Sequence, residues 1–305
     1  MKLLTIADTG MNVSEIALGC MRIAKLSDVE IDTLVRTALD GGINFFDHAD
    51  IYGGGQAEAR FAEALDWRGG LREKLFLQTK CGIRKGMFDF SKEHILASVE
   101  GSLQRLQTDY LDVLLLHRPD TLVEPEEVAA AFSELERSGK VRHFGVSNQH
   151  PMQIALLERY VKQPILFNQL QFSITNSGMV DAGLNVNMKN TASIDHDGGV
   201  LDYCRLNDIV IQPWSPFQHG FFAGAFVGNE KFPELNAVLD TIAQAHDITP
   251  SALAIAWILR HPAHMQPIIG TTNPERVRAI CKASHVTLSR AEWYEIYRAA
   301  GNTLP

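Results

Sequence analysis

The sequence lacks an excess of basic residues and lacks long hydrophobic runs. Its 305 residues include 28 lysines and arginines against 36 aspartates and glutamates, so the formal net charge is −8. Phosphate binding needs clustered basic charge, and this balance therefore disfavours a nucleic-acid partner. The most apolar runs, residues 111–116 and 252–259, are far shorter than the roughly 20 residues of a membrane-spanning helix. We therefore expect no membrane span.

Cysteine is scarce as well. The four cysteines are Cys20, Cys81, Cys204 and Cys281. They lie far apart without a C-x-x-C pair, which indicates reduced thiols rather than a disulfide framework or a zinc knuckle. His261 and His264 have no third ligand nearby, so we expect no metal site. The opening MKLLTIADTG reaches Asp and Gly too early for a secretory signal, and we expect a cytoplasmic protein.

Apolar runs alternate with amphipathic stretches along the whole chain, whose composition of 46% hydrophobic and 21% charged residues is globular. The runs predict strands at residues 16–20, 43–47, 75–80, 111–117, 143–147, 165–171, 209–214 and 267–270. Helical patterns cover residues 28–40, 57–65, 91–106, 125–138, 152–160, 200–206, 235–245, 250–260 and 274–281. Strand and helix in alternation imply parallel pairing through right-handed crossovers. Eight such units favour a (β/α)8 TIM barrel of the α/β class.

Two further segments complete this expectation of one domain over residues 1–305. A C-terminal extra helix is predicted from Ser289 to about Ala300, because Glu292 follows Ser289 at capping-box spacing. A long irregular loop, residues 175–199, follows the sixth strand. In a barrel every loop after a strand opens on the catalytic face, so this loop is a candidate lid over the active site.

Polar side chains stand at the C-terminal ends of successive strands, where barrel enzymes place their chemistry. The second strand runs into DHADIYG at residues 47–53, which contains Asp47 and Tyr52. The third strand ends at Lys80 and the fourth at His117. Any one of them could be a cap or a solvated side chain. Four of them on neighbouring strand ends predict a catalytic site.

These motifs resemble those of the aldo-keto reductases over nearly the whole chain. DHADIYG resembles the family pattern Asp-x-Ala-x-x-Tyr-Gly, and GVSN at residues 145–148 and Asn168-Gln169 match as well. Within the family the sequence looks like a bacterial group of predicted oxidoreductases whose characterised relatives are NADPH-dependent. The resemblance implies a reductase of aldehydes or ketones. Its catalytic tetrad would be Asp47, Tyr52, Lys80 and His117.

The chemistry requires the same side chains. Hydride addition to a carbonyl builds negative charge on oxygen, and Tyr52 is the expected proton donor. A cation in contact lowers the pKa of a phenol, and Lys80 would be that cation. Asp47 would hold the ammonium in place, and His117 would orient the substrate oxygen. Asp50 is the alternative partner for Lys80.

The expected cofactor, NADP(H), does not depend on a Rossmann motif, since G-x-G-x-x-G is absent and GGGQ at residues 53–56 has the wrong spacing. The resemblance implies that Ser147, Asn148 and Gln169 hold the carboxamide. Trp214, followed by Ser215 at the end of the seventh strand, would stack on the nicotinamide ring.

The resemblance also implies that the 2′-phosphate lies at the start of the helix after the eighth strand. The residues expected there are Gly270, Thr271, Thr272 and Arg276. Helix N-termini and arginine both favour phosphate. Many relatives have a lysine where this chain has Gly270, so the preference for NADP would depend on Arg276.

The substrate is poorly specified. Candidate residues for an apolar pocket are Cys20, Met21, Phe88, Phe90 and Phe217, each of which could equally anchor a loop. The expected partner is a small carbonyl compound. Two other functions stay open: a Schiff-base lyase with Lys80 as nucleophile, and a binding or regulatory module that holds NADP without turnover.

Overall fold

A computed structural model describes residues 1–6, 9–67 and 69–304 of the chain. Its centre is a parallel sheet of eight strands in the order β11-β10-β9-β8-β5-β4-β3-β12. The strands are β3 (Ala17–Gly19), β4 (Phe45–Asp47), β5 (Phe76–Cys81), β8 (Leu111–Leu116), β9 (Val141–Ser147), β10 (Ile165–Gln171), β11 (Val210–Trp214) and β12 (Ile268–Ile269). Each corresponds to one of the eight predicted runs.

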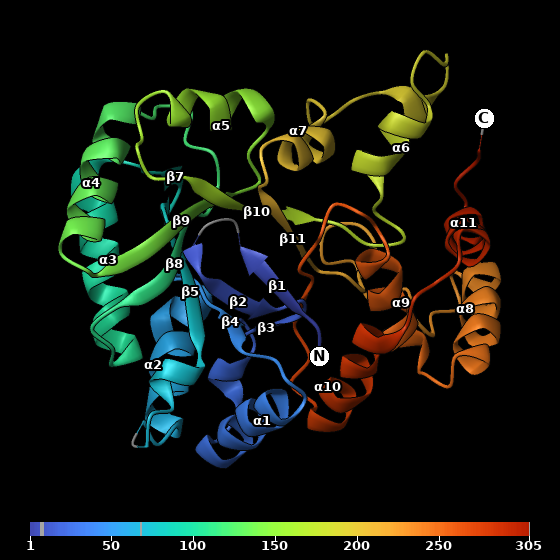
Figure 1. Ribbon diagram of the computed structural model, residues 1–305, viewed down its shortest axis with the longest axis horizontal. Coiled ribbons are helices and arrows are strands. Elements are labelled where there is room, and N and C mark those ends of the chain that lie inside the picture. The colour runs from blue at the N-terminus through green and yellow to red at the C-terminus, as the bar shows by residue number, and fades with distance from the viewer. Residues whose placement is uncertain (7–8, 68, 305) are drawn as a thin grey trace.

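The sheet curls into a barrel. The last strand of the barrel in sequence, β12, pairs in parallel with the first strand of the barrel, β3. On its other side the backbone N–H of Gln266 donates to the carbonyl of Ile211 in β11 at 2.9 Å. The helices surround this barrel (Figure 1). The (β/α)8 prediction is confirmed.

The helices are α1 (Asp28–Asp40), α2 (Gln56–Ala64), α3 (Lys92–Leu106), α4 (Pro125–Arg137), α5 (Pro151–Glu158), α6 (Gly178–Leu184), α7 (Val200–Leu206), α8 (Pro233–Ala245), α9 (Pro250–Leu259), α10 (Pro274–Cys281) and α11 (Arg290–Ala299). Ser27 and Glu30 form a capping box at α1, and Ser289 and Glu292 form one at α11. The predicted C-terminal helix is therefore present. No described helix is long and apolar enough to cross a membrane.

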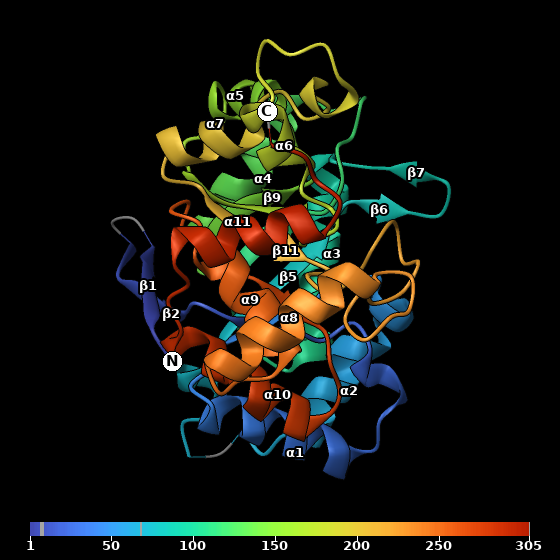
Figure 2. The same ribbon diagram turned by 90° about the vertical axis from the view of Figure 1, so that its right-hand side faces the viewer.

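Two short antiparallel hairpins were not predicted. One consists of β1 (Leu3–Ile6) and β2 (Met11–Ser14), and it closes the barrel at the amino ends of the strands. Ile6 and Val13 of this hairpin share a buried cluster with Phe45 and Phe167 from the barrel interior. The other, β6 (Ile83–Arg84) with β7 (Met87–Phe88), projects from the barrel after β5 (Figure 2).

The prediction that segment 175–199 forms a lid over the active site is wrong. The segment contains α6 and a short 3-10 helix, η5 (Thr191–Ser193). No described residue from 175 to 199 lines the cavity at the carboxyl ends of the strands, which Tyr52 and His117 line. The hydroxyl of Tyr297 in α11 donates a hydrogen bond to Asp181 Oδ1 at 2.7 Å, and Asn302 Nδ2 donates one to Ser177 Oγ at 3.3 Å. These bonds hold the segment against the C-terminal part of the chain, at the edge of the molecule (Figure 1).

Candidate active site

The four predicted catalytic side chains meet at the carboxyl end of the barrel. Asp47 is the last residue of β4, Lys80 lies near the end of β5, and His117 directly follows β8. Tyr52 begins the 3-10 turn η3 (Tyr52–Gly55) after β4. Parallel strands all end on one face, so residues far apart in sequence become neighbours there.

Lys80 is the centre of the cluster and is fully buried. Its Nζ donates to Asp47 Oδ2 at 2.8 Å, to the carbonyl of His48 at 2.7 Å and to Tyr52 Oη at 3.1 Å. An ammonium has three N–H donors, and these three acceptors use all of them. The ammonium group of Lys80 is therefore fixed in position next to the Tyr52 hydroxyl.

A chain of buried glutamines holds Asp47 from below. Gln78 Nε2 donates to Asp47 Oδ1 at 2.6 Å and to Gln212 Oε1 at 2.9 Å. Gln169 Nε2 reaches the same Asp47 oxygen at 3.0 Å. Gln212 continues to Gln266, whose amide donates to the carbonyl of Ser14 in β2 at 2.7 Å. Hydrogen bonds from several sides hold the carboxylate of Asp47 in one orientation.

The loop that carries Tyr52 is fixed to β5 by α2. Glu58 of α2 is fully buried and accepts hydrogen bonds from Thr79 Oγ1, the neighbour of Lys80, at 2.5 Å and from Arg105 Nε at 2.8 Å. The turn between Tyr52 and α2 needs glycine at Gly55, whose φ of +90° is in the left-handed region. Helix α2 therefore links the loop that carries Tyr52 to β5, the strand that carries Lys80.

Burial decides the protonation of the tyrosine. Burial raises the pKa of Tyr52, and although Lys80 lowers it, the net pKa lies above the ordinary value of 10.0. Lys80 lowers the pKa of Tyr52 as expected, but the loss of hydration outweighs the cation. Tyr52 therefore keeps its proton at neutral pH. Burial lowers the pKa of Lys80, but Asp47 and Tyr52 reverse this and raise it, so the lysine is an ammonium.

His117 is neutral. Burial, followed by the charges of Lys80 and Arg118, holds the pKa of His117 well below 6.5. Its ring meets that of Tyr52 edge-on, with 5.9 Å between centroids, and its buried Nδ1 has no hydrogen-bond partner in the described part of the chain. A neutral imidazole has one N–H donor and one acceptor nitrogen. His117 can therefore share a substrate oxygen with Tyr52.

Asp50 is not the partner of Lys80. Its backbone N–H donates to the Lys80 carbonyl at 3.0 Å, whereas the carboxylate bonded to Lys80 Nζ is that of Asp47. Burial, with a smaller contribution from the charge of Glu58, raises the pKa of Asp50 to about 7. The alternative considered from the sequence is therefore decided in favour of Asp47.

A cavity of about 980 Å³ opens above the tetrad. Eight of the nine predicted cofactor residues line it: Ser147, Asn148, Gln169, Trp214, Ser215, Gly270, Thr271 and Arg276. Thr272 does not line it. The cavity thus extends from Tyr52 and His117 at one end to the start of α10 at the other, along the carboxyl ends of the strands.

Only some of the predicted substrate residues lie at the cavity. Met21 and Phe217 line the cavity, whereas Cys20, Phe88 and Phe90 do not. Cys20 and Phe90 face the core instead and are at most 1% exposed, and Phe88 lies on the projecting β6–β7 hairpin. The lining residues that the sequence did not suggest include Arg118, Phe221 and Phe222. Arg118 could have been found from its position directly after a catalytic strand end.

The aromatic wall of the cavity is built on Trp214. Its Nε1 donates to Asn148 Oδ1 at 3.1 Å, and Phe222 stacks beside it with 6.1 Å between centroids. Asn148 and Ser215 have φ of +56° and +53°, left-handed values at the ends of β9 and β11. Such strained positions outside glycine are often found at functional sites. They turn the side chains after each strand toward the cavity.

The far end of the cavity is the start of α10. Asn273 caps this helix by accepting from the backbone N–H of Arg276 at 3.1 Å. The side chain of Arg276 is exposed, and it forms no ion pair with the described residues. A free guanidinium beside a helix N-terminus favours an anion.

Comparison with known proteins agrees with this geometry. The model of the aldo/keto reductase family matches residues 15–300, and the chain belongs to this family of oxidoreductases. It is 38% identical to the uncharacterized oxidoreductase YcsN of Bacillus subtilis (strain 168), over 90% of this chain and 89% of that one. It is 35% identical to a 6-dehydroglucose reductase of Agrobacterium fabrum (strain C58 / ATCC 33970), over 95% of both chains.

A solved structure shows the same architecture. The crystal structure of the thermostable aldo-keto reductase Tm1743, in complex with the inhibitor epalrestat, superposes with a TM-score of 0.78 at 26% sequence identity. The match covers 98% of this chain and all of that one.

Proposed function

We propose that this protein is an NADPH-dependent carbonyl reductase that converts an aldehyde or ketone to an alcohol. The observation that carries the proposal is the position of Lys80 Nζ, bonded to both Asp47 and Tyr52 Oη at the base of the cavity. A protonated phenol, an ammonium that supports it and a neutral imidazole next to it form a proton-donating site.

The residues around the cavity fit a nicotinamide cofactor. Trp214 offers an aromatic face, and Ser147, Asn148 and Gln169 offer amide and hydroxyl groups close to it. Arg276 and Thr271 offer a cation and a hydroxyl at the other end. Apolar stacking at one end and a cation at the other match the ring and the 2′-phosphate of NADPH.

The chain's own residues then perform the proton half of the reaction. When bound, the cofactor supplies a hydride to the carbonyl carbon. Tyr52 Oη donates its proton to the carbonyl oxygen, so that one hydride and one proton have been added across the double bond. Lys80 stabilises the phenolate that remains, and solvent restores its proton. His117 and Tyr52 together orient the oxygen before transfer.

The geometry disfavours the two other functions. A Schiff-base lysine must attack as a free amine. The pKa of Lys80 is raised, and all three of its N–H groups are bonded. A module that only binds NADP would have no need for the buried Lys80–Asp47 ion pair, which costs free energy to desolvate.

Turnover tests the proposal. We expect the purified protein to oxidise NADPH in the presence of some members of a panel of aldehydes, ketones and diones, with one alcohol formed per NADPH. Hydroxyaldehydes belong in the panel because of the relative named a 6-dehydroglucose reductase. NADPH binding without turnover on the whole panel would favour the binding module, and borohydride trapping of a substrate on Lys80 would favour the lyase.

A further inference from the structure

The cavity carries a positive charge that the tetrad does not explain. Arg22, Arg118 and Arg276 line it, whereas Asp47 is the one carboxylate among its described lining residues. Asp47 is neutralised by Lys80 at 2.8 Å. The wall of the cavity is therefore cationic in a molecule whose net charge is −8. Such local charge attracts and retains anions.

Arg118 lies at the reacting end of this cavity. It directly follows His117, and its Cζ is 5.7 Å from the ring centroid of Trp214. It acts together with burial and Lys80 to lower the pKa of His117. Arg276 is at the other end, where the proposed function assigns it the 2′-phosphate. The proposed function therefore assigns no group of the cofactor to Arg118.

Apart from the Trp214 ring, the guanidinium of Arg118 has no ion-pair or hydrogen-bond partner among the described residues. Its side chain is half-buried, yet within residues 1–6, 9–67 and 69–304 no carboxylate pairs with it and no acceptor bonds to its guanidinium. Elsewhere in the molecule the buried Arg72 and the half-buried Arg105 each form an ion pair, with Asp112 and Glu58. A half-buried guanidinium with five unused N–H donors is suited to a ligand that brings its own acceptor oxygens.

We propose that Arg118 determines substrate specificity by binding a carboxylate on the carbonyl substrate. The inference deepens the proposed function and rests on it. The carbonyl would face Tyr52 and His117, and the carboxylate would pair with the planar fork of Arg118. The apolar wall of Trp214 and Phe222 would contact the part of the substrate between them. The preferred substrates are then aldehyde or keto acids rather than neutral carbonyl compounds.

The test uses substrate pairs that differ in charge and little in shape. One pair is 4-formylbenzoate and its neutral methyl ester, and the other is succinate semialdehyde and butanal. We expect the anionic member of at least one pair to have the higher kcat/KM, chiefly through a lower KM. Added salt should reduce this preference, because part of it is electrostatic.

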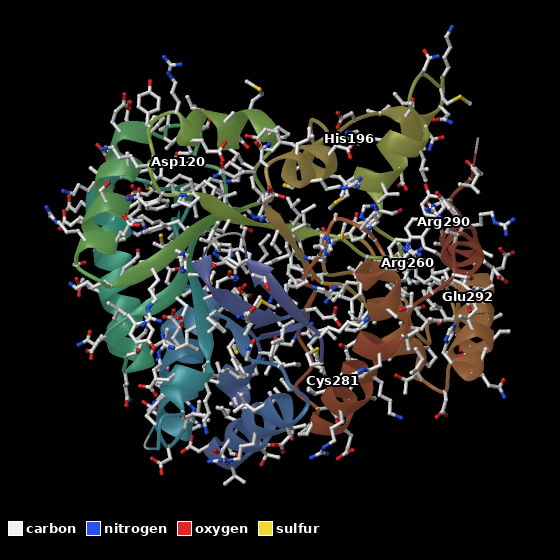
Figure 3. All side chains as sticks on the ribbon, in the orientation of Figure 1. Asp120, His196, Arg260, Cys281, Arg290 and Glu292 are labelled. Carbon is white, nitrogen blue, oxygen red and sulfur yellow. The ribbon has the colours of Figure 1, made fainter. Side chains whose placement is uncertain are left out.

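Variants assign the preference to Arg118. We expect Arg118→Met to lower kcat/KM for the anionic substrate by about 10- to 150-fold, the range of a charge-assisted hydrogen bond, and to leave the neutral partner within about threefold. Arg118→Lys keeps the charge without the fork and should retain part of the activity. Arg290→Met is the matched control, since Arg290 lies on α11 at the periphery (Figure 3) and its loss changes the net charge equally.

Four results would overturn the inference. They are equal kcat/KM within both pairs, equal losses in Arg118→Met for the charged and the neutral member, a matching loss with neutral D-glyceraldehyde, and a comparable weakening of NADPH binding. The third would show that Arg118 binds hydroxyl groups, and the fourth that it binds the cofactor.

Binding separates this inference from the proposed function. If no carbonyl compound is reduced, the reductase proposal fails. Calorimetric titration of 4-formylbenzoate in the presence of NADP⁺ then still tests Arg118. Binding to the wild type that is lost in Arg118→Met supports carboxylate recognition, and equal binding to both proteins, or none to the wild type, overturns it.

Discussion

Two carboxylates near Lys80 have opposite environments, although Asp47 ends β4 and Asp50 lies only three residues further on. Asp47 receives hydrogen bonds from Lys80, Gln78 and Gln169. Asp50 has a buried Oδ1 without a partner and faces the negative charge of Glu58. Hydrogen-bond donors favour the charged form of a carboxyl group, and burial near a second carboxylate favours the neutral form. The end of β4 and the residues after it thus supply a carboxylate held by three donors and, at Asp50, a group whose pKa is about 7.

Asp50 should therefore reduce stability as the pH rises. Its native pKa of about 7 exceeds the ordinary 3.8, so the native state binds more protons between these values. The free energy of unfolding then falls from about pH 4 to pH 7 and is constant above, as far as this group contributes. Asp50→Asn should change the free energy of unfolding more favourably at pH 8 than at pH 5, and the difference between the two changes should be up to about 2–3 kcal/mol.

Urea denaturation at the two pH values measures this difference. Asp240→Asn is the matched control, because it is the same chemical change at an exposed position on α8. A change in Asp50→Asn that is the same at both pH values would mean that the carboxyl group of Asp50 is not protonated in the native state at pH 5.

At this scale the sequence was informative about chemistry and less so about orientation. Asp47, Tyr52, Lys80 and His117 follow from a motif and from strand ends, because parallel strands bring those ends together. Phe90 could not be placed: it packs against Gly82, where an added Cβ would lie 2.4 Å from the Phe90 ring. Whether an aromatic residue in a loop faces core or cavity depends on such tertiary packing.

At the scale of elements, α10 carries the prediction on cofactor choice. Arg276→Ala should weaken NADPH binding by about 10-fold, the lower end for a charge-assisted hydrogen bond, because its side chain is exposed and screened by salt. NADH, which has no 2′-phosphate, should bind almost as before. Titration of both cofactors into both proteins checks this. Equal losses would assign Arg276 a structural role in α10, and a wild-type preference for NADH would contradict the assignment of NADPH.

The elements that the sequence did not reveal are those that depend on tertiary contacts. β1 and β2 pair only with each other, and Leu3 is 56% exposed, so no buried apolar run marks them. β6 and β7 have two residues each. Gly178 and Gly183 lower the helix propensity of α6, which is held instead by the bond from Tyr297 to Asp181. The long amphipathic helices and the barrel strands needed no such support.

At the scale of the molecule, the two ends of the barrel have different tasks. The β1–β2 hairpin and its apolar cluster close the amino end. The glutamine chain, Gln78, Gln169, Gln212 and Gln266, crosses the interior from Ser14 of that hairpin to Asp47. The carboxyl end holds the tetrad and the cavity. A rigid, closed floor beneath the site keeps Lys80 directed at Tyr52, as a preorganised proton donor requires.

The most direct test of this account is the single-turnover rate of Tyr52→Phe with NADPH and the best aldehyde of the panel. The substitution removes the hydroxyl and little else. We expect the rate of NADPH oxidation to fall by about 10²- to 10⁴-fold, as for the loss of a general acid, while the Kd for NADPH changes by less than about threefold. A rate within about threefold of wild type, with binding intact, would contradict the account and place the proton donor elsewhere.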